Sequence, residues 1–497
     1  MSDIREIIVP LDCSLLDALN VLNSSEYLIL LAVDQKGVLV RTITDGDVRR
    51  LILERKDVNV RIDEFSVQNP VVVSTSATDA DVLKLMRLNE INLIPIIDAS
   101  GRPVGIHMKA NIDKTILLSA PHMGDHEQHY VREAFDSNWI APIGPNVDAF
   151  EKEISDYVGG SHVAVVNSGT AAIHLALRLL NISHGDFVFC QSFTFIASVN
   201  PVLYQCATPV FIDSEHSTWN MCPLALESAL EVHQATNNLP KAIIVVHLYG
   251  NSARMKEILN VANAYGVPVI EDAAESIGSF YQGKHTGTMG KFGIFSFNGN
   301  KIITTSGGGA LISHDKDMIN KARFLSTQAK DQAPHYEHSE VGYNYRMSNV
   351  LAGIGRGQLE VLDQRVRTRR AVLQKYKDKL SHITHISWMP DVADDYSNCW
   401  LSVLSIDPKK TNVTPKILIQ ALFDQQIEAR HVWKPMHQQK LFANNDYYFL
   451  KDKSFCDYLF ETGVCLPSSS SITISQQDFV IESIIKVFTG NNSENMD

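Results

Sequence analysis

Lys301 stands where a lysine side chain could do covalent chemistry. It follows the polar turn Asn298-Gly299-Asn300 and precedes the triple glycine Gly307-Gly308-Gly309. Serial glycines permit close backbone approach and dihedral angles that residues with a Cβ rarely adopt. Because most lysines are solvated surface residues, a reactive role for Lys301 needs support from elsewhere in the chain.

An acid at the end of a predicted strand gives the first support. Val267 to Glu271 is typical of a buried strand and runs into Asp272, twenty-nine residues before Lys301. Such a pair suits pyridoxal phosphate, since a lysine binds it as a Schiff base and an acid holds its ring nitrogen protonated. Capping a helix is the alternative role for Asp272, but the spacing to Lys301 favours the cofactor.

A small-residue turn that opens a helix gives the second support. Asn167-Ser168-Gly169-Thr170 follows the apolar run Val163 to Val166 and precedes an amphipathic segment. The free N–H groups and the positive end of such a helix attract a phosphate group. The order and spacing of this turn, Asp272 and Lys301 together predict a pyridoxal 5'-phosphate site.

Composition limits the class of protein. A chain of 497 residues can form two or three domains, and 45% hydrophobic with 20% charged residues is ordinary for a soluble globular protein. The net charge of −12 argues against a general nucleic-acid-binding surface. Seven scattered cysteines without a C-x-x-C pair predict reduced thiols and no metal site. No signal peptide and no membrane-length apolar run is visible, so we expect a cytoplasmic protein.

The first 112 residues contain a weak internal repeat at an offset of 64. Asp17-Ala18-Leu19 falls on Asp81-Val82-Leu83, and the turn 34–37 falls on the turn 98–101. Each copy is too small to bury a full core, so the two should pack as one unit. The pattern resembles a tandem pair of cystathionine-β-synthase (CBS) domains over residues 1–112.

The CBS resemblance implies an adenine-nucleotide site in the first copy. Thr44 and Asp47 match the residues that contact the ribose and phosphate in that family. The second copy departs from the pattern, because Met108 and Asn111 stand at the equivalent offset. Nucleotide sensing and a docking or dimerisation module are therefore both open.

From the predicted helix 147–158 to about residue 330, short apolar runs alternate with helical patterns. This alternation predicts a mainly parallel sheet with helices on both faces, whose ligands bind at the carboxyl ends of the strands. Ser168, Asp272 and Lys301 all fall at such ends. The expected strands are 163–166, 187–190, 209–212, 242–247, 267–271, 292–297 and 309–313.

Long segments of this region resemble the DegT-type nucleotide-sugar aminotransferases, a branch of the fold-type I pyridoxal phosphate enzymes. The resemblance covers about 118–488 and implies an α/β fold with a large cofactor-binding domain, 121–364, and a small C-terminal domain, 365–488. Residues 113–120 would be a linker and 489–497 a disordered tail. The segments that carry it are SGTAAIHLAL, SFTFIAS, VVHLYGN, EDAAESIGS, FSFNGNKIITTSGGG and GYNYRMSNVLAGIG.

The resemblance assigns roles around the cofactor. Lys301 would bind it covalently and move a proton, and Asp272 would pair with the pyridinium nitrogen. Asn344 resembles the asparagine that reaches the phosphate in the neighbouring subunit, which implies a homodimer or higher oligomer with shared active sites. The other expected contacts are Phe195 on the ring, Glu275 near the 3′-hydroxyl, and Ser168, Gly169, Thr170 and Ser296 around the phosphate.

The closest resemblance is to aminotransferases of N-acetylbacillosamine biosynthesis that act on UDP-4-keto-6-deoxy-N-acetylglucosamine. PHMG (121–124), DSNWIAPIGP (136–145) and WKPMH (433–437) support it. It implies amino transfer from L-glutamate to C4, giving UDP-4-amino-4,6-dideoxy-N-acetylglucosamine. The residues it places around the substrate are Trp139, Ile140, Ala141, Pro142, Ile143, His335, Tyr336, Trp433, Lys434 and His437.

Other functions compete with this assignment. A dTDP- or GDP-linked 4-keto-6-deoxy sugar is the alternative substrate, because no residue identifiably reads the base. A sugar 3-dehydratase would carry histidine in place of Lys301. A non-catalytic regulatory protein of the same fold is disfavoured by the intact pair of Lys301 and Asp272.

Overall fold

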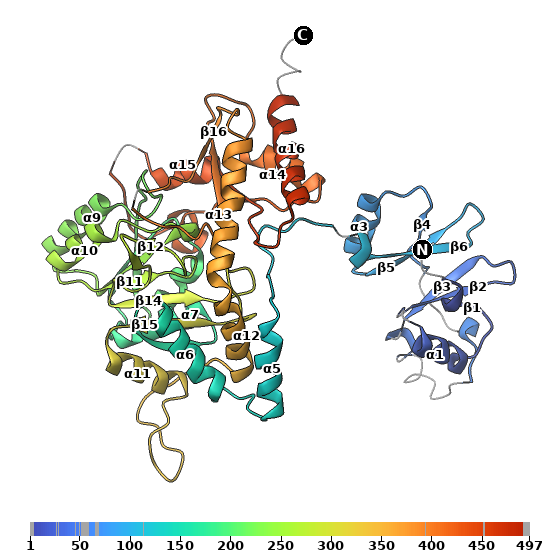
Figure 1. Cartoon of the computed structure of the whole chain (residues 1–497), viewed down its shortest axis with the longest axis horizontal. Coiled ribbons are helices and arrows are strands. Elements are labelled where there is room, and N and C mark those ends of the chain that lie inside the picture. Colours follow the sequence, from blue (N-terminus) through green and yellow to red (C-terminus); the bar gives the residue numbers. More distant parts are fainter. Residues whose placement is uncertain are drawn as a thin grey trace. The chain divides into compact units, whose positions relative to one another are not determined.

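The computed structural model describes residues 4–25, 27, 29–44, 46–48, 50, 59–64, 69–112, 114–392, 394–450 and 453–490. The chain forms two compact units, Met1–Thr115 and Ile116–Asp497, whose helices and strands are shown in Figure 1. Within the described ranges, no helix combines the length and apolar character that crossing a membrane requires.

The N-terminal unit contains two three-stranded sheets of the same topology. In each sheet the first strand pairs parallel with the second, and the second pairs antiparallel with the third. The strands are β1 (Ile8–Pro10), β2 (Ile29–Val33), β3 (Leu39–Thr44), β4 (Val73–Ser74), β5 (Leu93–Ile97) and β6 (Pro103–Met108). The described helical segments are η1 (Ile4–Ile7), α1 (Leu15–Ser24), η2 (Ile62–Glu64), α3 (Asp79–Leu88) and α4 (Lys109–Ile112).

The structure repeats at the offset of 64 that the sequence predicts. Helices α1 and α3 both begin after a hydroxyl N-cap, Ser14 and Thr78, whose side chain accepts a hydrogen bond from the first turn. The turns after β2 and β5 place Gly37 and Gly101 at φ of 78° and 80°, a region that favours glycine. Leu93 of the second copy packs against the core of the first, so the copies form one unit.

An eight-stranded sheet lies at the centre of the C-terminal unit. Its order is β19-β9-β8-β10-β11-β14-β15-β7, and β15 alone among these strands runs antiparallel to its neighbours. The strands are β7 (His162–Val166), β8 (Phe187–Gln191), β9 (Thr208–Ile212), β10 (Ala242–Val246), β11 (Val269–Asp272), β14 (Phe292–Ser296), β15 (Gly309–Ser313) and β19 (Tyr447–Tyr448).

Successive residues of each strand are buried on opposite faces of this sheet. Ala164 and Val166 pack with α7 (Gly169–Leu179) and α11 (Lys316–Ser326). Val163 and Val165 pack with the core around α6 (Pro145–Tyr157) and α12 (Asn349–Glu360). Both faces are therefore covered, as predicted. The remaining elements of this layer are α5 (His126–Asp136), η3 (Ile196–Ser198), α8 (Asn200–Tyr204), α9 (Pro223–Ala235), η4 (Leu248–Gly250), α10 (Met255–Ala264), β12 (Phe280–Tyr281) and β13 (Lys284–His285).

A second, antiparallel sheet forms the C-terminal part of the chain. Its order is β16-β17-β20-β18, and a separate apolar core lies beneath it. Its strands are β16 (Ile386–Trp388), β17 (Ser402–Ile406), β18 (Arg430–His431) and β20 (Gly463–Leu466). Its helical segments are α13 (Leu362–Lys379), α14 (Pro415–Asp424), η5 (Met436–Gln438), η6 (Lys440–Phe442), α15 (Phe455–Thr462) and α16 (Ile474–Gly490).

The structure modifies three of the expected boundaries. Helix α13 runs through the predicted domain boundary at 364/365, so the division into a large and a small domain stays a prediction. Helix α16 extends to Gly490, which corrects the predicted start of the disordered tail; residues 491–497 lie outside the described residues. The expected linker 113–120 is bound to the C-terminal unit from Ile116 onward, where its N–H donates to the Gln426 carbonyl.

Candidate active site

A cavity of about 440 Å³ opens at the carboxyl ends of the parallel strands. Its lining comes from the turn after β7, the loop after β8, the ends of β11 and β14, and the C-terminal part of the chain. Residues far apart in the sequence therefore meet at one place. The predicted site residues in this lining are Ser168, Gly169, Thr170, Phe195, Asp272, Glu275, Ser296, Lys301 and Trp433.

The turn before α7 forms a cradle for an anion. Ser168 caps the helix, its hydroxyl accepting from the Ala171 N–H at 3.1 Å, and the first N–H groups of a helix have no intrahelical acceptor. Glycine allows the surrounding strands to approach, because a Cβ on Gly309 would lie 2.5 Å from the Gly169 nitrogen. A Cβ on Gly169 would in turn lie 3.1 Å from the Cβ of Ser296. This cradle fits a phosphate group.

Asp272 ends β11 and is almost fully buried, with 4% of its surface exposed. One carboxylate oxygen accepts from the Ser198 hydroxyl at 2.7 Å, and the other accepts from the Ala274 N–H at 3.1 Å. Thr194 lies 2.8 Å from the same Ser198 hydroxyl. These bonds fix the orientation of the Asp272 carboxylate at the cavity wall.

Lys301 reaches the cavity between a carboxylate and an aromatic face. Its Nζ lies 3.7 Å from Glu275 Oε1 and 4.0 Å from the centroid of the Trp400 ring. Glu275 is buried, not a surface carboxylate, and accepts from the Tyr249 N–H at 2.7 Å. Burial raises the pKa of Glu275, while Lys301 and the Tyr249 N–H act in the opposite direction. The amine is thus held close to the Glu275 carboxyl group.

Two aromatic side chains form a further part of the wall. The Phe195 ring is 48% exposed, which rules out an ordinary core position, and lies 5.0 Å from the Trp433 ring. Trp433 stacks on Tyr249, and its backbone N–H donates to the Tyr249 hydroxyl at 2.9 Å. The Trp433 indole N–H is buried and faces Glu275 without reaching full hydrogen-bond geometry.

Several lining residues were not predicted from the sequence. Ser198 belongs to the SFTFIAS segment, where only Phe195 was singled out, and Arg430 stands three residues before Trp433. Their proximity to predicted residues was the available signal. Trp400 has no local motif, so packing alone brings it to the site. The other unpredicted lining residues are Asn167, Ile173, Thr194, Ala197, Val246, Ala274, Asn298, Asn300, Gly307 and Gly308.

The remaining predicted substrate residues lie outside this cavity lining. His437 lies 2.7 Å from the Ser192 hydroxyl and 2.9 Å from the Asp457 carboxylate, and its ring stacks on Tyr447. Lys434 is exposed. The backbone carbonyls of Trp139 and Ala141 accept from Asn349, and the side chains of Trp139, Ile140 and Ile143 are exposed; Pro142 continues this exposed segment.

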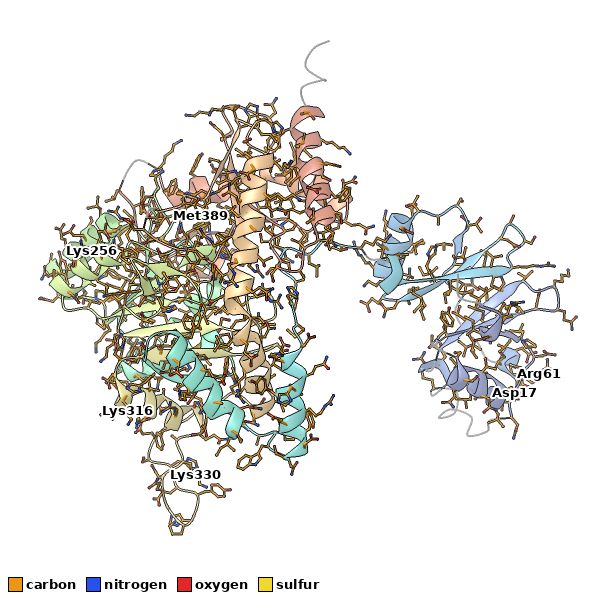
Figure 2. The ribbon with its side chains drawn as sticks, viewed as in Figure 1. Asp17, Arg61, Lys256, Lys316, Lys330 and Met389 are labelled. Carbon is orange, nitrogen blue, oxygen red and sulfur yellow. The ribbon has the colours of Figure 1, made fainter. Side chains whose placement is uncertain are left out.

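The predicted substrate residues His335 and Tyr336 are also exposed, as is Asn344, which was predicted to act across subunits. Tyr336 is 82% exposed and lies under the Lys330 ammonium, on the long projecting loop where Figure 2 marks Lys330. His335 pairs with Glu337 on the same loop. Asn344 is exposed, and its carbonyl accepts from the Asn167 side chain at 3.1 Å.

Thr44 and Asp47 lie together in the N-terminal unit. The Thr44 hydroxyl donates to the Asp47 carboxylate at 2.6 Å, and Arg50 forms an ion pair with the same carboxylate. The Thr44 hydrogen bonds lower the pKa of Asp47 against the effect of its partial burial. Nucleotide binding by these residues stays a prediction.

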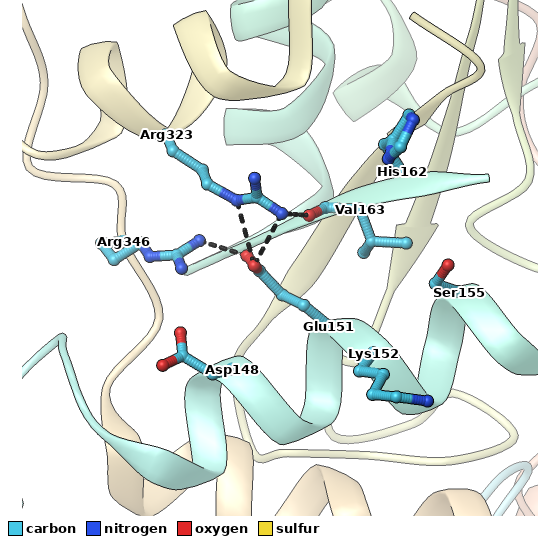
Figure 3. Close-up of a pocket in the computed structure, with 8 residues that line it drawn as sticks. All are labelled: Asp148, Glu151, Lys152, Ser155, His162, Val163, Arg323 and Arg346. Carbon is cyan, nitrogen blue, oxygen red and sulfur yellow. Dashed lines mark hydrogen bonds and ion pairs between the residues drawn. The ribbon is translucent and has the colours of Figure 1, made fainter. Parts of the chain in front are cut away.

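An ion cluster around the buried Glu151 lies next to the strand that leads to the phosphate cradle. Glu151 on α6 accepts from Arg323 and Arg346 (Figure 3). It also accepts from the Val165 N–H of β7 at 2.8 Å. Arg346 also donates to the Val165 carbonyl at 3.1 Å. The neighbouring Asn167 N–H donates to the Tyr345 carbonyl at 2.7 Å. The cluster thereby ties the end of β7, just before the cradle, to the segment around Arg346.

Replacing Glu151 by alanine is expected to destabilise the protein by about 3 kcal/mol, since it leaves the buried guanidinium of Arg346 without its carboxylate. Urea unfolding monitored by circular dichroism measures this. The exposed Lys152→Ala on the same helix is the control and should change stability by no more than about 0.5 kcal/mol. Equal stability of the two variants would show that the Glu151 cluster does not support the fold.

The chain matches proteins of known family. Residues 121–485 match the DegT/DnrJ/EryC1/StrS aminotransferase family, and residues 62–106 match the CBS domain. The putative pyridoxal phosphate-dependent aminotransferase EpsN of Bacillus subtilis is 56% identical over 376 residues, 76% of this chain and 96% of EpsN. GDP-perosamine synthase of Caulobacter vibrioides is 37% identical over 373 residues, 75% of this chain and 98% of the synthase. The crystal structure of a DegT DnrJ EryC1 StrS aminotransferase from Brucella abortus has a TM-score of 0.67 at 26% identity, over 73% of this chain and 95% of that one.

Proposed function

We propose a reaction for this chain, which belongs to the DegT/DnrJ/EryC1/StrS aminotransferase family. In this reaction the amino group of L-glutamate is transferred to C4 of UDP-4-keto-6-deoxy-N-acetylglucosamine. The product is then UDP-4-amino-4,6-dideoxy-N-acetylglucosamine. That the chain is a pyridoxal phosphate-dependent sugar aminotransferase follows from the family. The observation that carries the proposed chemistry is one cavity that joins Lys301, Asp272 and the glycine-lined phosphate cradle.

Pyridoxal phosphate, when bound, supplies the carbon that carries the amino group between substrates and a ring that withdraws electrons from it. The cradle at Ser168, Gly169 and Thr170, with Ser296, would hold the phosphate. Asp272 would face the ring nitrogen, and the exposed face of Phe195 would cover the ring. Glu275 lies between Lys301 and Tyr249, where it would meet the polar edge of the ring.

Lys301 would perform the proton transfers. Its Nζ is confined by the Trp400 face and the Glu275 carboxyl group, with only 14% of the side chain exposed. A lysine held in this way can take a proton from the carbon of the amino donor and later give one to C4 of the sugar. Confinement keeps the amine within reach of the reacting carbon and limits access of water.

Residues at the cavity wall would bind the sugar nucleotide. Arg430 is exposed, lines the cavity and forms an ion pair with Glu428. Its planar guanidinium suits bidentate binding of a diphosphate. The Trp433 ring and its buried indole N–H offer a stacking face and a donor for the sugar or base.

Comparing the catalytic efficiency on different nucleotide sugars tests the substrate. UDP-, dTDP- and GDP-linked 4-keto-6-deoxy sugars are supplied with L-glutamate, and kcat/KM is measured for each. We expect the UDP-linked N-acetylamino sugar to exceed the others by at least about tenfold, which corresponds to roughly 1.4 kcal/mol. If kcat/KM is highest with the GDP-linked sugar, that sugar is the substrate and the UDP-linked assignment is wrong. The similarity to GDP-perosamine synthase is the reason for including the GDP sugar.

We also propose that two copies share their active sites. The side chains of Trp139, Ile143 and Tyr336 are exposed, and Asn344 lies outside the cavity lining of its own chain. A second copy could bring these residues to the cavity. Light scattering of the purified protein should give twice the mass of one chain or a multiple of that, and a monomer with full activity would contradict shared sites.

A further inference from the structure

The residue before Lys301 is held by bonds that the proposed reaction does not use. The carbonyl of Asn300 accepts from the Ser119 hydroxyl at 2.7 Å and from the Trp400 indole N–H at 2.8 Å. A carbonyl oxygen has two acceptor sites, so these two donors occupy both. The backbone that carries Lys301 is thereby fixed from two directions.

A single guanidinium holds both donors. Arg369 on α13 donates to Ser119 Oγ at 3.0 Å and to the Trp400 carbonyl. Its side chain is only 1% exposed, and in the described ranges no carboxylate forms an ion pair with it. Burial lowers the pKa of Arg369 to about 9. Burying a cation without a counter-charge is costly, so we interpret the planar guanidinium of Arg369 as a residue that orients Ser119 and Trp400.

Trp400 links this network directly to the amine. Its indole N–H bonds the Asn300 carbonyl, while its ring face lies 4.0 Å from Lys301 Nζ. Trp400 is itself 1% exposed and its carbonyl is bound by Arg369. The Trp400 side chain therefore holds the backbone before Lys301 and also contacts the Lys301 amine through its ring.

We infer that Ser119, Arg369 and Trp400 are positioning residues that fix where the Lys301 amine lies. The inference rests on the proposed role of Lys301. It gives the segment 116–120 a part in the active site, because this segment is bound to the C-terminal unit on both sides of Ser119. Leu118 accepts from the Ser468 N–H at 2.7 Å, and Ala120 accepts from the Ser469 hydroxyl at 3.2 Å.

Ser119→Ala tests the inference, with Ser469→Ala as the matched control. Each substitution removes one buried hydroxyl that bonds a carbonyl, but only Ser119 bonds the residue before Lys301. Apoprotein of each variant is mixed with pyridoxal phosphate, and the rate at which the visible absorbance band forms is recorded. The kcat and KM of the holoenzyme and the unfolding midpoint are also measured.

We expect Ser119→Ala to slow formation of the absorbance band about tenfold and to lower kcat about tenfold, with KM unchanged. The reason is that the Asn300 carbonyl and the Arg369 guanidinium each lose a hydrogen-bond partner. Ser469→Ala should change both rates less than twofold. Arg369→Lys keeps the positive charge but loses the planar set of guanidinium donors, so its band formation and kcat should be at least as slow as those of Ser119→Ala. The rate losses of the double variant Ser119→Ala/Arg369→Lys should be smaller than the two single losses combined.

The opposite result would overturn the inference. If Ser119→Ala and Ser469→Ala lower the unfolding midpoint equally and leave both rates within twofold of wild type, Ser119 serves only the fold. Formation of the band requires no sugar nucleotide, so an error in the proposed substrate leaves this test intact.

Discussion

Replacing Lys301 by alanine is expected to lower kcat for amino transfer by about 10⁴-fold, the upper range for removal of a general acid–base group. The variant also loses the amine that binds the cofactor covalently. The phosphate cradle and Asp272 are untouched, so the protein should still bind pyridoxal phosphate, but with the absorbance of the free aldehyde. Steady-state assays with L-glutamate and the keto sugar, together with absorbance spectra of the purified variant, measure both effects.

The control for Lys301 is another lysine of the same unit. Lys256→Ala removes an exposed side chain on α10 (Figure 2) that does not belong to the cavity lining. Its kcat and spectrum should match those of the wild type. Activity of Lys301→Ala within about tenfold of wild type would contradict the proposed role of Lys301 in the reaction.

The sequence predicted those site residues that lie next to a recognisable element. Ser168 follows an apolar strand and opens a helix, and Asp272 ends another strand, so their positions at one edge of the sheet follow from the order of elements. Lys301 was found through its glycine-rich surroundings. Gly309 shows why those glycines are needed, since a Cβ there would collide with the backbone of the cradle.

The residues that the sequence did not reveal come from packing between distant segments. Trp400 lies about a hundred positions after Lys301 in the chain, yet its indole bonds the residue before that lysine. Arg430 lies on a two-residue strand with no apolar pattern. Neither periodicity nor local motif encodes such contacts, because they depend on how the second sheet docks against the first.

The fold was predictable to a similar extent. The expected strands of the large sheet agree with the observed ones to within two residues, because strands buried on both faces are continuous apolar runs. The reversed direction of β15 was not predicted, since burial on both faces gives the same pattern in either direction. The extension of α16 to Gly490 was also missed, because Thr489 and Gly490 belong to the polar run 489–497 and no apolar residue marks the end of the helix.

Asp272→Asn is expected to produce the second large effect, a loss of up to about 10³-fold in kcat. An opposite charge at hydrogen-bond distance changes a pKa by about one to three units, and each unit corresponds to a factor of ten. Asparagine keeps the shape and an oxygen that can accept from Ser198, but it lacks the charge that would retain the proton on the ring nitrogen. Assays of kcat, with cofactor affinity and the unfolding midpoint measured alongside, separate this chemical effect from loss of binding or folding.

Ser198→Ala distinguishes the charge of Asp272 from its orientation. This variant removes the 2.7 Å bond to the carboxylate but keeps the charge and the bond from the Ala274 N–H. Loss of one hydrogen bond to a charged group costs about 1.5–3 kcal/mol, so a loss of roughly ten- to a hundredfold in kcat is expected. If charge is what matters, Asp272→Asn must be clearly slower than Ser198→Ala. Equal losses would mean that the carboxylate acts only through its placement, and that the electron-withdrawing character of the ring does not depend on Asp272.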